Sequence, residues 1–346
     1  MPELQLSVII PSRDGRELLA ACLPPLLADL EALGEAEVIV VDDHSSDDSL
    51  SFLREAFPKI RIVALNATSG STGAAGFAAA CNAGAHLARA PTLAFLNNDA
   101  EVRLGWSAAL LAALDADAHA AIAGGLTLFR TFPPTVNSAG VLVGHSGSAA
   151  DIGLGARLSA VNLAPRAVAA VSGVSMAARA DWFGATGGFE EQLFMYFEDV
   201  ELCVRAWREG RSVRFTPESV VLHRGAATAG QRQDRLRSYY GSRNRLLVAA
   251  LCLDRSDLPR AVAVLLAQDL AAVASLAARG QLRAAVMTSR GRARGAGDGL
   301  RSLRAARQRR LAKKRYVRDF AELHELGLIA GLGATLREFA RLQRLR

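Results

Sequence analysis

Two neighbouring carboxylates, Glu198 and Asp199, stand where a run of aromatic residues passes into a helix. Apolar residues recur at helical spacing after Asp199 until Gly210, which favours a helix that ends there. A carboxylate at the entrance of such a helix can act as a general base. Both residues could instead cap the helix and complement its dipole. The glycine pair 187–188 and the aromatic residues 194–197 favour the catalytic interpretation.

Polar side chains also follow three predicted strands at the points where the strands end. Apolar runs rich in β-branched residues at 6–10, 38–41 and 92–96 predict buried parallel strands. They lead into residues 12–14, 42–43 and 97–99. Carboxyl ends of parallel strands meet at the edge where open α/β sheets bind ligands, so we expect a site there. Asp42 and Asp43 alone would also suit an Asx turn.

The remaining elements complete an α/β pattern. Helices are expected at 16–33, where Pro24 and Pro25 should kink or interrupt the helix, and at 78–89. Further strands are expected at 60–64, 213–216 and 219–222, and the last of these leads to His223. Residues 120–175 are punctuated by glycines, which favours loops and short strands. The alternation predicts a mostly parallel, Rossmann-like central sheet with flanking helices.

Charge divides the chain into two parts. Residues 1–230 carry 16 Arg and Lys against 25 Asp and Glu, whereas residues 231–346 carry 25 against 9. We therefore expect one module over 1–230 and a basic, mostly helical region over 231–346. The four cysteines have no metal-site or disulfide spacing, which indicates a reducing cytoplasm. The first ten residues lack the basic region of a secretory signal.

The basic region has two interpretations. Residues 261–278 are apolar and nearly long enough to span a bilayer, but Gln268 and Asp269 stand at their centre, which favours an interfacial or packed helix. Residues 301–318 are dense in Arg and Lys. Nucleic acid is not an expected partner, because no recognised nucleic-acid module is present. Attachment to an anionic membrane surface uses the same charges and is favoured.

Taken together, these motifs resemble the family 2 glycosyltransferases, which have the GT-A fold. The nearest subgroup comprises bacterial enzymes that transfer rhamnose or galactofuranose in cell-envelope polysaccharide synthesis. Five segments carry the resemblance: SVIIPSRD (7–14), VIVVDDHSSDDS (38–49), LAFLNNDAEV (93–102), VSGVSMAARADWFGATGGFEEQLFMYFEDVELCVRAWREG (171–210) and VVLHRG (220–225). It continues weakly through 237–247.

The resemblance implies a role for each matching position. Asp199, beside Glu198, matches the catalytic base. Asp99 and His223 match ligands of a divalent cation, Mg²⁺ or Mn²⁺, that bridges the two phosphates of the donor. The nucleotide-sugar site would comprise Pro11, Ser12, Arg13, Asp42 or Asp43, Asn97 and Asn98. The acceptor side would comprise Trp182, Gly187, Gly188 and Tyr196.

Three positions depart from the family pattern. Asn97 stands where the family carries the first Asp of its DXD motif, so metal binding depends more on Asp99 and His223. Arg13 stands where relatives often have an aromatic residue, although a guanidinium can also stack on a base. The loop 66–77 has no basic residue, so it could bind phosphate only through backbone N–H groups.

The sequence therefore predicts an inverting glycosyltransferase. Its donor would be a nucleotide-diphospho-sugar, with rhamnose favoured and galactofuranose second, and its acceptor a glycan or a polyprenyl-linked molecule. The expected location is cytoplasmic, peripheral at the inner face of the cell membrane. A non-catalytic nucleotide- or carbohydrate-binding relative of the same fold is the alternative. A Rossmann oxidoreductase is disfavoured, because the glycine fingerprint is missing.

Overall fold

The computed structural model describes residues 4–65, 73–130, 135–144, 146–225, 230–253 and 256–310. The strands are β1 (Leu6–Ser12), β2 (Ala36–Asp42), β3 (Arg61–Ala64), β4 (Thr92–Leu96), β5 (Ala100–Val102), β6 (Ala120–Phe129), β7 (Val136–Ser138), β8 (Val141–Val143), β9 (Ala149–Asp151), β10 (Arg166–Ala167), β11 (Ser175–Arg179) and β12 (Ser212–His223). The helices are α1 (Arg16–Leu33), α2 (Ser49–Ala56), α3 (Phe77–Leu87), α4 (Trp106–Asp115), α5 (Ala180–Ala185), α6 (Glu198–Arg208), α7 (Gly230–Cys252), α8 (Leu258–Ala278) and α9 (Leu282–Arg310). Short 3₁₀ turns cover Leu158–Ala160 and Glu191–Leu193.

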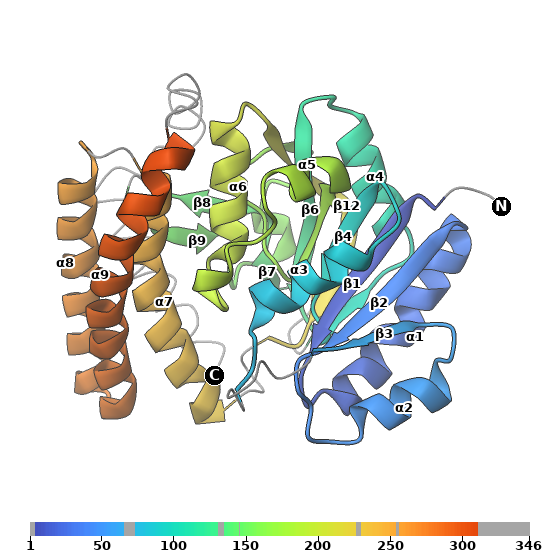
Figure 1. Cartoon of the computed structure of the whole chain (residues 1–346), viewed down its shortest axis with the longest axis horizontal. Coiled ribbons are helices and arrows are strands. Elements are labelled where there is room, and N and C mark those ends of the chain that lie inside the picture. The colour runs from blue at the N-terminus through green and yellow to red at the C-terminus, as the bar shows by residue number, and fades with distance from the viewer. Residues whose placement is uncertain are drawn as a thin grey trace.

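The central sheet has the order β10-β12-β6-β11-β4-β1-β2-β3 (Figure 1). Its half from β4 to β3 is parallel, since β1 pairs in parallel with both β2 and β4, and β2 pairs in parallel with β3. Strand β11 runs antiparallel between β4 and β6, and β12 returns parallel to β6. The expected mostly parallel sheet is confirmed, with an antiparallel strand inside it.

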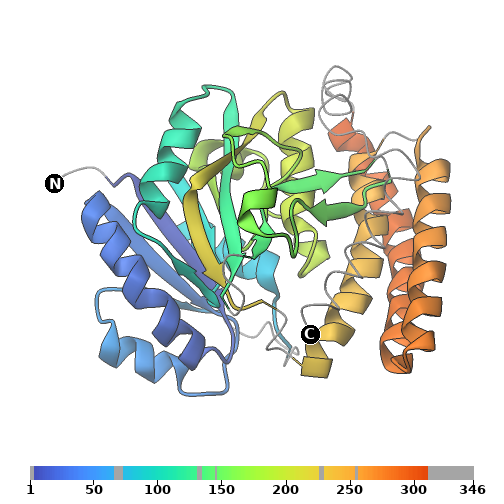
Figure 2. The ribbon, with the colours of Figure 1, turned by 180° about the vertical axis from the view of Figure 1, so that it is seen from behind.

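Helices cover both faces of this sheet. Alternate strand residues point to opposite faces, so Val8 and Ile10 pack with α1 and α4, whereas Ile9 packs with α3 and α6. Helices α3 and α6 lie in front of the sheet in Figure 1. Figure 2 shows the opposite side of the molecule, where α1 and α4 lie in front of the sheet. The carboxyl edge of the parallel strands is left to loops, and this edge holds the candidate site.

The middle of the chain contains more regular structure than expected. Strand β6 crosses the sheet within the region predicted as loops and short strands. A Cβ at Gly124 would lie 2.4 Å from that of Val171, and a Cβ at Gly125 would lie 2.1 Å from the carbonyl oxygen of Ser219. These glycines therefore allow neighbouring chain segments to approach closely, and they do not mark a turn.

One predicted strand boundary is wrong, and a predicted interruption of the helix at 16–33 does not occur. The strands expected at 213–216 and 219–222 form one strand, β12, whose register against β6 shifts between Thr216 and Val220. Helix α1 continues through Pro24 and Pro25, so these prolines do not interrupt it.

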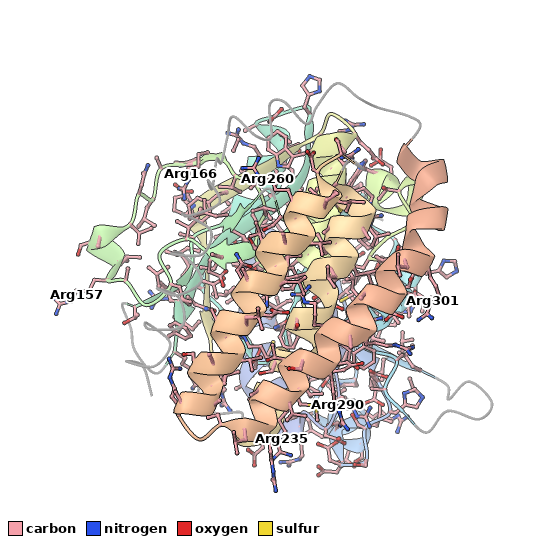
Figure 3. All side chains as sticks on the ribbon, turned by 90° about the vertical axis from the view of Figure 1, so that its left-hand side faces the viewer. Arg157, Arg166, Arg235, Arg260, Arg290 and Arg301 are labelled. Atoms are coloured by element: carbon pink, nitrogen blue, oxygen red, sulfur yellow. The ribbon has the colours of Figure 1, made fainter. Side chains whose placement is uncertain are left out.

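The basic region is helical, as expected, as far as residue 310. Helices α7, α8 and α9 lie side by side next to α6 (Figures 1 and 3). Leu247, Val248 and Cys252 of α7 join the core cluster that covers the sheet, so the helices are anchored to it. The division at residue 230 stays a prediction. Residues 311–318 of the basic stretch and residues 66–72 of the glycine-rich loop lie outside the described residues.

Helix α8 is long and apolar enough to cross a membrane, judged by length and composition alone, within the part of the chain that the structure describes. About 33% of its apolar window is buried against the rest of the protein.

Candidate active site

The sheet brings Asp199 to the same edge as the turn 97–99. Strand β11 runs antiparallel to β4 and begins with Ser175 opposite Leu96, so the residues before β11 lie beside those after β4. The N–H of Asn97 donates to the carbonyl oxygen of Val174 at 2.9 Å. The N–H of Gly173 donates to Oδ2 of Asp199 at 2.7 Å. One short segment of backbone thus joins the candidate base Asp199 to the turn 97–99.

Asp199 is partly buried and held by backbone groups. Its Oδ1 accepts a hydrogen bond from the N–H of Val200 at 2.8 Å, and its Oδ2 accepts the bond from Gly173. Among the described residues it has no ion-pair partner, so its charge is available to a ligand. It does not act as the side-chain cap of α6, because the cap position is Phe197 and no side-chain capping bond forms.

Gly173 is a site residue to which the sequence analysis gave no role. A Cβ at this position would lie 3.2 Å from Oδ2 of Asp199, closer than an ordinary contact. A glycine therefore lets the carboxylate approach the N–H of residue 173. The sequence signal was a single glycine before an unrecognised strand, and it could not show what packs against it.

Glu198 differs from its neighbour in environment. It is 6% exposed, and its Oε2 has no hydrogen-bond partner. Burial, and then the charge of Asp199, raise the pKa of Glu198 well above its ordinary value. Burial also raises the pKa of Asp199, but hydrogen bonds from Gly173 and Val200 oppose the shift. Both pKa values are raised, that of Glu198 the more strongly, so Glu198 is the better proton holder of the pair and Asp199 the better candidate base.

We predict that Glu198→Gln becomes progressively more stable than the wild type as pH rises. A carboxyl group whose pKa is higher in the folded than in the unfolded protein stabilises the fold most below its ordinary pKa of 4.5. That contribution is lost as pH rises towards the folded value. Urea unfolding at pH values between 4.5 and about 8 measures the difference in unfolding free energy between the variant and the wild type. Over this range the difference should shift in favour of the variant by about 1–3 kcal/mol, which is the cost of leaving a buried polar group unsatisfied.

The control is Glu31→Gln, because Glu31 is exposed on α1. Its unfolding free energy should follow that of the wild type across the same pH range. A Glu198→Gln protein whose difference from the wild type does not change with pH would contradict a raised pKa at Glu198.

Asp99 and His223 lie together across the end of β12. Nε2 of His223 is 3.2 Å from Oδ1 of Asp99, and Nδ1 of His223 is 2.8 Å from Oδ1 of Asn137. Burial pushes the pKa of Asp99 up, but the hydrogen bond and charge of His223 more than offset this, and the net pKa is below its ordinary value. The buried Oδ1 of Asn97 has no hydrogen-bond partner.

These donors fit a divalent cation only in part. Carboxylate and amide oxygens suit Mg²⁺ and Mn²⁺, and imidazole suits Mn²⁺ less well. Within the described ranges, no three side chains of His, Cys, Asp or Glu gather closely enough to hold a metal. Asp99, His223 and the orphaned oxygen of Asn97 could therefore hold a cation only when a ligand supplies further oxygens.

The structure distinguishes Asp42 from Asp43. The carboxylate of Asp43 accepts hydrogen bonds from the N–H groups of Ala75 and Gly76, at 2.7 and 2.9 Å, and so fixes the loop before α3. Oδ2 of Asp42 accepts the N–H of Ser45 at 3.1 Å, whereas its Oδ1 is buried without a partner. Asp42 is the carboxylate that has an oxygen left for a ligand.

The other predicted nucleotide-side residues lie at the same edge. Ser12 pairs with Asp42 across β1 and β2, and its hydroxyl accepts a bond from the side-chain amide of Asn98 at 3.0 Å. Pro11 is half-buried in β1, and Arg13 is exposed beside it. The structure thus brings together the ends of β1, β2 and β4, as the sequence predicted.

The predicted acceptor-side residues are divided. Trp182 lies in α5 and is 7% exposed. Helix α5 follows the end of β11 that pairs with the first residue of β4. Trp182 therefore lies away from the carboxyl edge of the sheet. Its indole N–H donates to Glu209 at 2.8 Å. Gly187 and Gly188 lie beside the middle of α3, where Asn82 bonds the next residue. Of this group, Tyr196 is the residue nearest to Asp199 along the chain.

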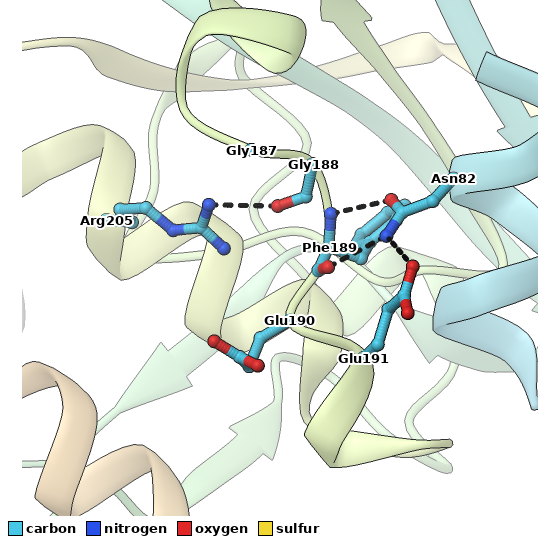
Figure 4. A pocket seen from close by; sticks show the side chains of 7 residues that line it. All are labelled: Asn82, Gly187, Gly188, Phe189, Glu190, Glu191 and Arg205. Atoms are coloured by element: carbon cyan, nitrogen blue, oxygen red, sulfur yellow. Dashed lines mark hydrogen bonds between the residues drawn. The ribbon is translucent and has the colours of Figure 1, made fainter. Parts of the chain in front are cut away.

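A hollow of about 200 Å³ lies beside these glycines (Figure 4). It is lined by Asn82, the segment 187–191 and Arg205. The guanidinium of Arg205 donates to the carbonyl oxygen of Gly188 at 2.9 Å and also pairs with Glu201 of its own helix. These groups bind one another, which indicates that they fix the turn before α6.

The residues immediately before Glu198 have unusual backbone angles. Phe194, Tyr196 and Phe197 have φ of 64°, 67° and 73°, in the left-handed region that bulky residues rarely adopt. Such conformations persist only where surrounding contacts impose them. The segment that positions Asp199 is therefore held in place from outside.

Asn244 of α7 supplies much of that restraint. Its side-chain nitrogen lies 2.8, 2.9 and 2.8 Å from the carbonyl oxygens of Leu193, Met195 and Tyr196. Asn244 is fully buried. The sequence analysis missed it, because segment 237–247 carried only a weak resemblance and the contact spans about fifty residues.

We predict that Asn244→Ala lowers the free energy of unfolding by about 2–4 kcal/mol, because three backbone carbonyl oxygens lose the amide group that they share as donor while the strained backbone remains. Urea denaturation measures this change. The control is Asn162→Ala, since Asn162 is exposed and its side chain accepts a hydrogen bond from the nearby N–H of Ala164. That control should lose less than about 1 kcal/mol. Equal effects of the two substitutions would contradict the restraint assigned to Asn244.

The amino-terminal part of the chain, with β1, β2 and β4, has recognisable relatives. Residues 7–133 match the model of Glycosyl transferase family 2. This family 2 region contains Ser12, Asp42 and Asp99 and ends before Asp199 and His223.

Two curated relatives share 39% identity with this chain over 66 residues. Each is an N-acetylglucosaminyl-diphospho-decaprenol L-rhamnosyltransferase of Mycobacterium tuberculosis, one from strain CDC 1551 / Oshkosh and one from strain ATCC 25618 / H37Rv. The match covers 19% of this chain and 22% of each relative, so it spans about a fifth of their length.

Solved structures resemble the fold beyond the family 2 region. GalNAc-T7, solved with UDP, GalNAc and Mn²⁺, superposes with a TM-score of 0.52 at 16% identity, over 69% of this chain and 51% of its own. The mannosyltransferase PcManGT from Pyrobaculum calidifontis, solved with GDP-Man and Mn²⁺, gives 0.49 at 17% identity, over 97% and 88%. At such identity the first likeness concerns the fold alone, and it agrees with the expected GT-A architecture.

Proposed function

We propose that the protein is an inverting glycosyltransferase that uses a nucleotide-diphospho-sugar. Asp199 accepts the proton of an acceptor hydroxyl while that oxygen attacks the anomeric carbon of the donor sugar. The bond from this carbon to the diphosphate breaks on the opposite face, and the nucleoside diphosphate leaves. Attack from the opposite face inverts the anomeric configuration.

The observation that supports this proposal most is the backbone link from Asp199 through Gly173 and Val174 to Asn97. It places an ionisable carboxylate at the edge that also holds Asp42, Ser12 and Asp99. Burial raises the pKa of Asp199, which makes it a stronger base than a solvated carboxylate, and burial and the charge of Asp199 raise the pKa of Glu198 well above its ordinary value. The family 2 match over residues 7–133 supports a nucleotide-sugar donor.

We assign Asp42 to the nucleobase and Asp99 to a divalent cation, with His223 and Asn97 beside it. Oδ1 of Asp42 and Oδ1 of Asn97 are buried without partners, which is expected of groups that await a ligand. A bound cation would supply positive charge to the departing diphosphate. The pairing of His223 with Asp99 keeps both groups at one point, where the donor phosphates can complete the coordination.

For the donor sugar we propose rhamnose first and galactofuranose second, and for the acceptor a glycan or a polyprenyl-linked molecule in cell-envelope polysaccharide synthesis. The 66-residue match to an enzyme that rhamnosylates a decaprenol-linked sugar supports this choice. We place the enzyme in the cytoplasm, at the inner face of the cell membrane. The four cysteines are buried and none forms a disulfide, which agrees with a reducing compartment.

The test is Asp199→Asn, which keeps the size of the side chain and removes the base. We expect transfer to fall by at least about a hundredfold, the lower end of general-base contributions. Binding of the donor should persist. Thermal shifts with UDP-, dTDP- and GDP-sugars, each with Mn²⁺ or a chelator, identify the donor class and show whether a cation is needed.

Asp115→Asn is the matched control, because Asp115 is exposed at the end of α4. It should transfer at the wild-type rate. Near-normal turnover by Asp199→Asn would assign the base elsewhere. Donor binding by a wild-type protein that never transfers sugar would favour the non-catalytic relative.

A further inference from the structure

One face of the helical region combines exposed apolar residues with unbalanced positive charge. This face is formed by the outward sides of α8 and α9, and we call it the α8–α9 face (Figure 3). Residues 258–301 contain two carboxylates, Asp269 and Asp298, and both are buried. Asp298 pairs with the exposed Arg294 and Arg301, and no exposed carboxylate lies in this segment to balance its other exposed arginines.

The inward side of α8 is fixed to its neighbours. Asp269 is 5% exposed and accepts hydrogen bonds from Ser242 at 2.8 Å, from Arg245 at 2.7 Å and from Arg292. If α8 crossed a bilayer, Asp269 would enter hydrocarbon and its ion pairs with Arg245 and Arg292 would be lost. Despite its apolar composition, α8 is therefore not a membrane-spanning helix.

The outward side of α8 is apolar along its length. Leu266 and Leu270 are 44% and 71% exposed, one turn apart. The exposed residues around them on the same side are alanines, at 263, 267 and 274. Because the neighbouring side chains are small, these two leucine side chains project from α8 and can enter an apolar medium without any rearrangement of the helix.

Helix α9 adds both apolar and basic groups. Leu282, Val286 and Leu300 are 63%, 52% and 68% exposed. The arginines exposed on α8, on α9 and at the turn between them are Arg260, Arg279, Arg283, Arg290, Arg294 and Arg301. Figure 3 shows Arg260 near one end of α8, and Arg290 and Arg301 along α9.

We infer that the α8–α9 face lies on the surface of an anionic lipid bilayer, with both helices in the plane of the membrane. Acyl chains accept the leucine side chains, and lipid phosphates accept the arginines. This inference deepens the proposed function, because it states how the enzyme would meet a lipid-linked acceptor. It also excludes insertion of α8 as a membrane span.

The test measures binding of the full chain to phosphatidylcholine vesicles with and without phosphatidylglycerol. Binding should require the anionic lipid and weaken with added salt. Leu270→Glu should lower the partition coefficient by at least about tenfold, because a leucine leaves the acyl region and a negative charge is added. Leu104→Glu is the matched control, since Leu104 is 74% exposed before α4, and it should bind like the wild type.

Each other outcome overturns the inference. Normal binding by Leu270→Glu would assign membrane contact elsewhere, for instance to residues 311–346. Resistance of the bound protein to alkaline extraction would show a spanning helix. A wild-type dimer that Leu270→Glu dissociates would make the face a contact between copies. Vesicle binding needs neither donor nor acceptor, and thermal shifts with donor sugar report on the proposed function separately.

Discussion

The hydrogen bond from the N–H of Gly173 to Oδ2 of Asp199 is the contact on which the candidate site depends. Gly173 belongs to the short segment that enters the antiparallel strand β11, and the next residue, Val174, accepts a bond from Asn97. One backbone segment therefore relates the carboxylate at the start of α6 to the turn after β4. Without β11 between β4 and β6, no shared backbone segment would fix Asp199 relative to the turn after β4.

This arrangement lowers stability locally, and distant helices compensate. Three residues before α6 adopt left-handed backbone angles, and Glu198 is buried with an unpaired oxygen. Asn244 restrains the strained segment from α7. Helix α7 is in turn tied to α8 and α9 by Arg245, Asp269 and Arg292. The helical region thus contributes to the geometry of the site as well as to a surface of its own.

The sequence predicted well what depends on local pattern. The apolar runs of β1, β2 and β4 were continuous and β-branched, so their ends, and with them Ser12, Asp42 and Asp99, could be placed at one edge. It predicted poorly what depends on partners distant in the chain. Strand β6 was hidden by Gly124 and Gly125, which are required by Val171 and Ser219. Gly173 and Asn244 act through contacts that no sequence periodicity reveals. Trp182 was predicted on the acceptor side of the site, but β11 carries the chain away from that edge before Trp182 is reached.

The most direct measurement is a crystal structure of the protein with a nucleoside diphosphate and Mn²⁺, with the ion located by anomalous scattering. Our account predicts the ion beside Asp99, the base beside Asp42, and the carboxylate of Asp199 still bonded to the N–H of Gly173 and facing the space beyond the diphosphate. An ion or nucleotide bound away from this edge, or an Asp199 side chain turned from it, would contradict the account.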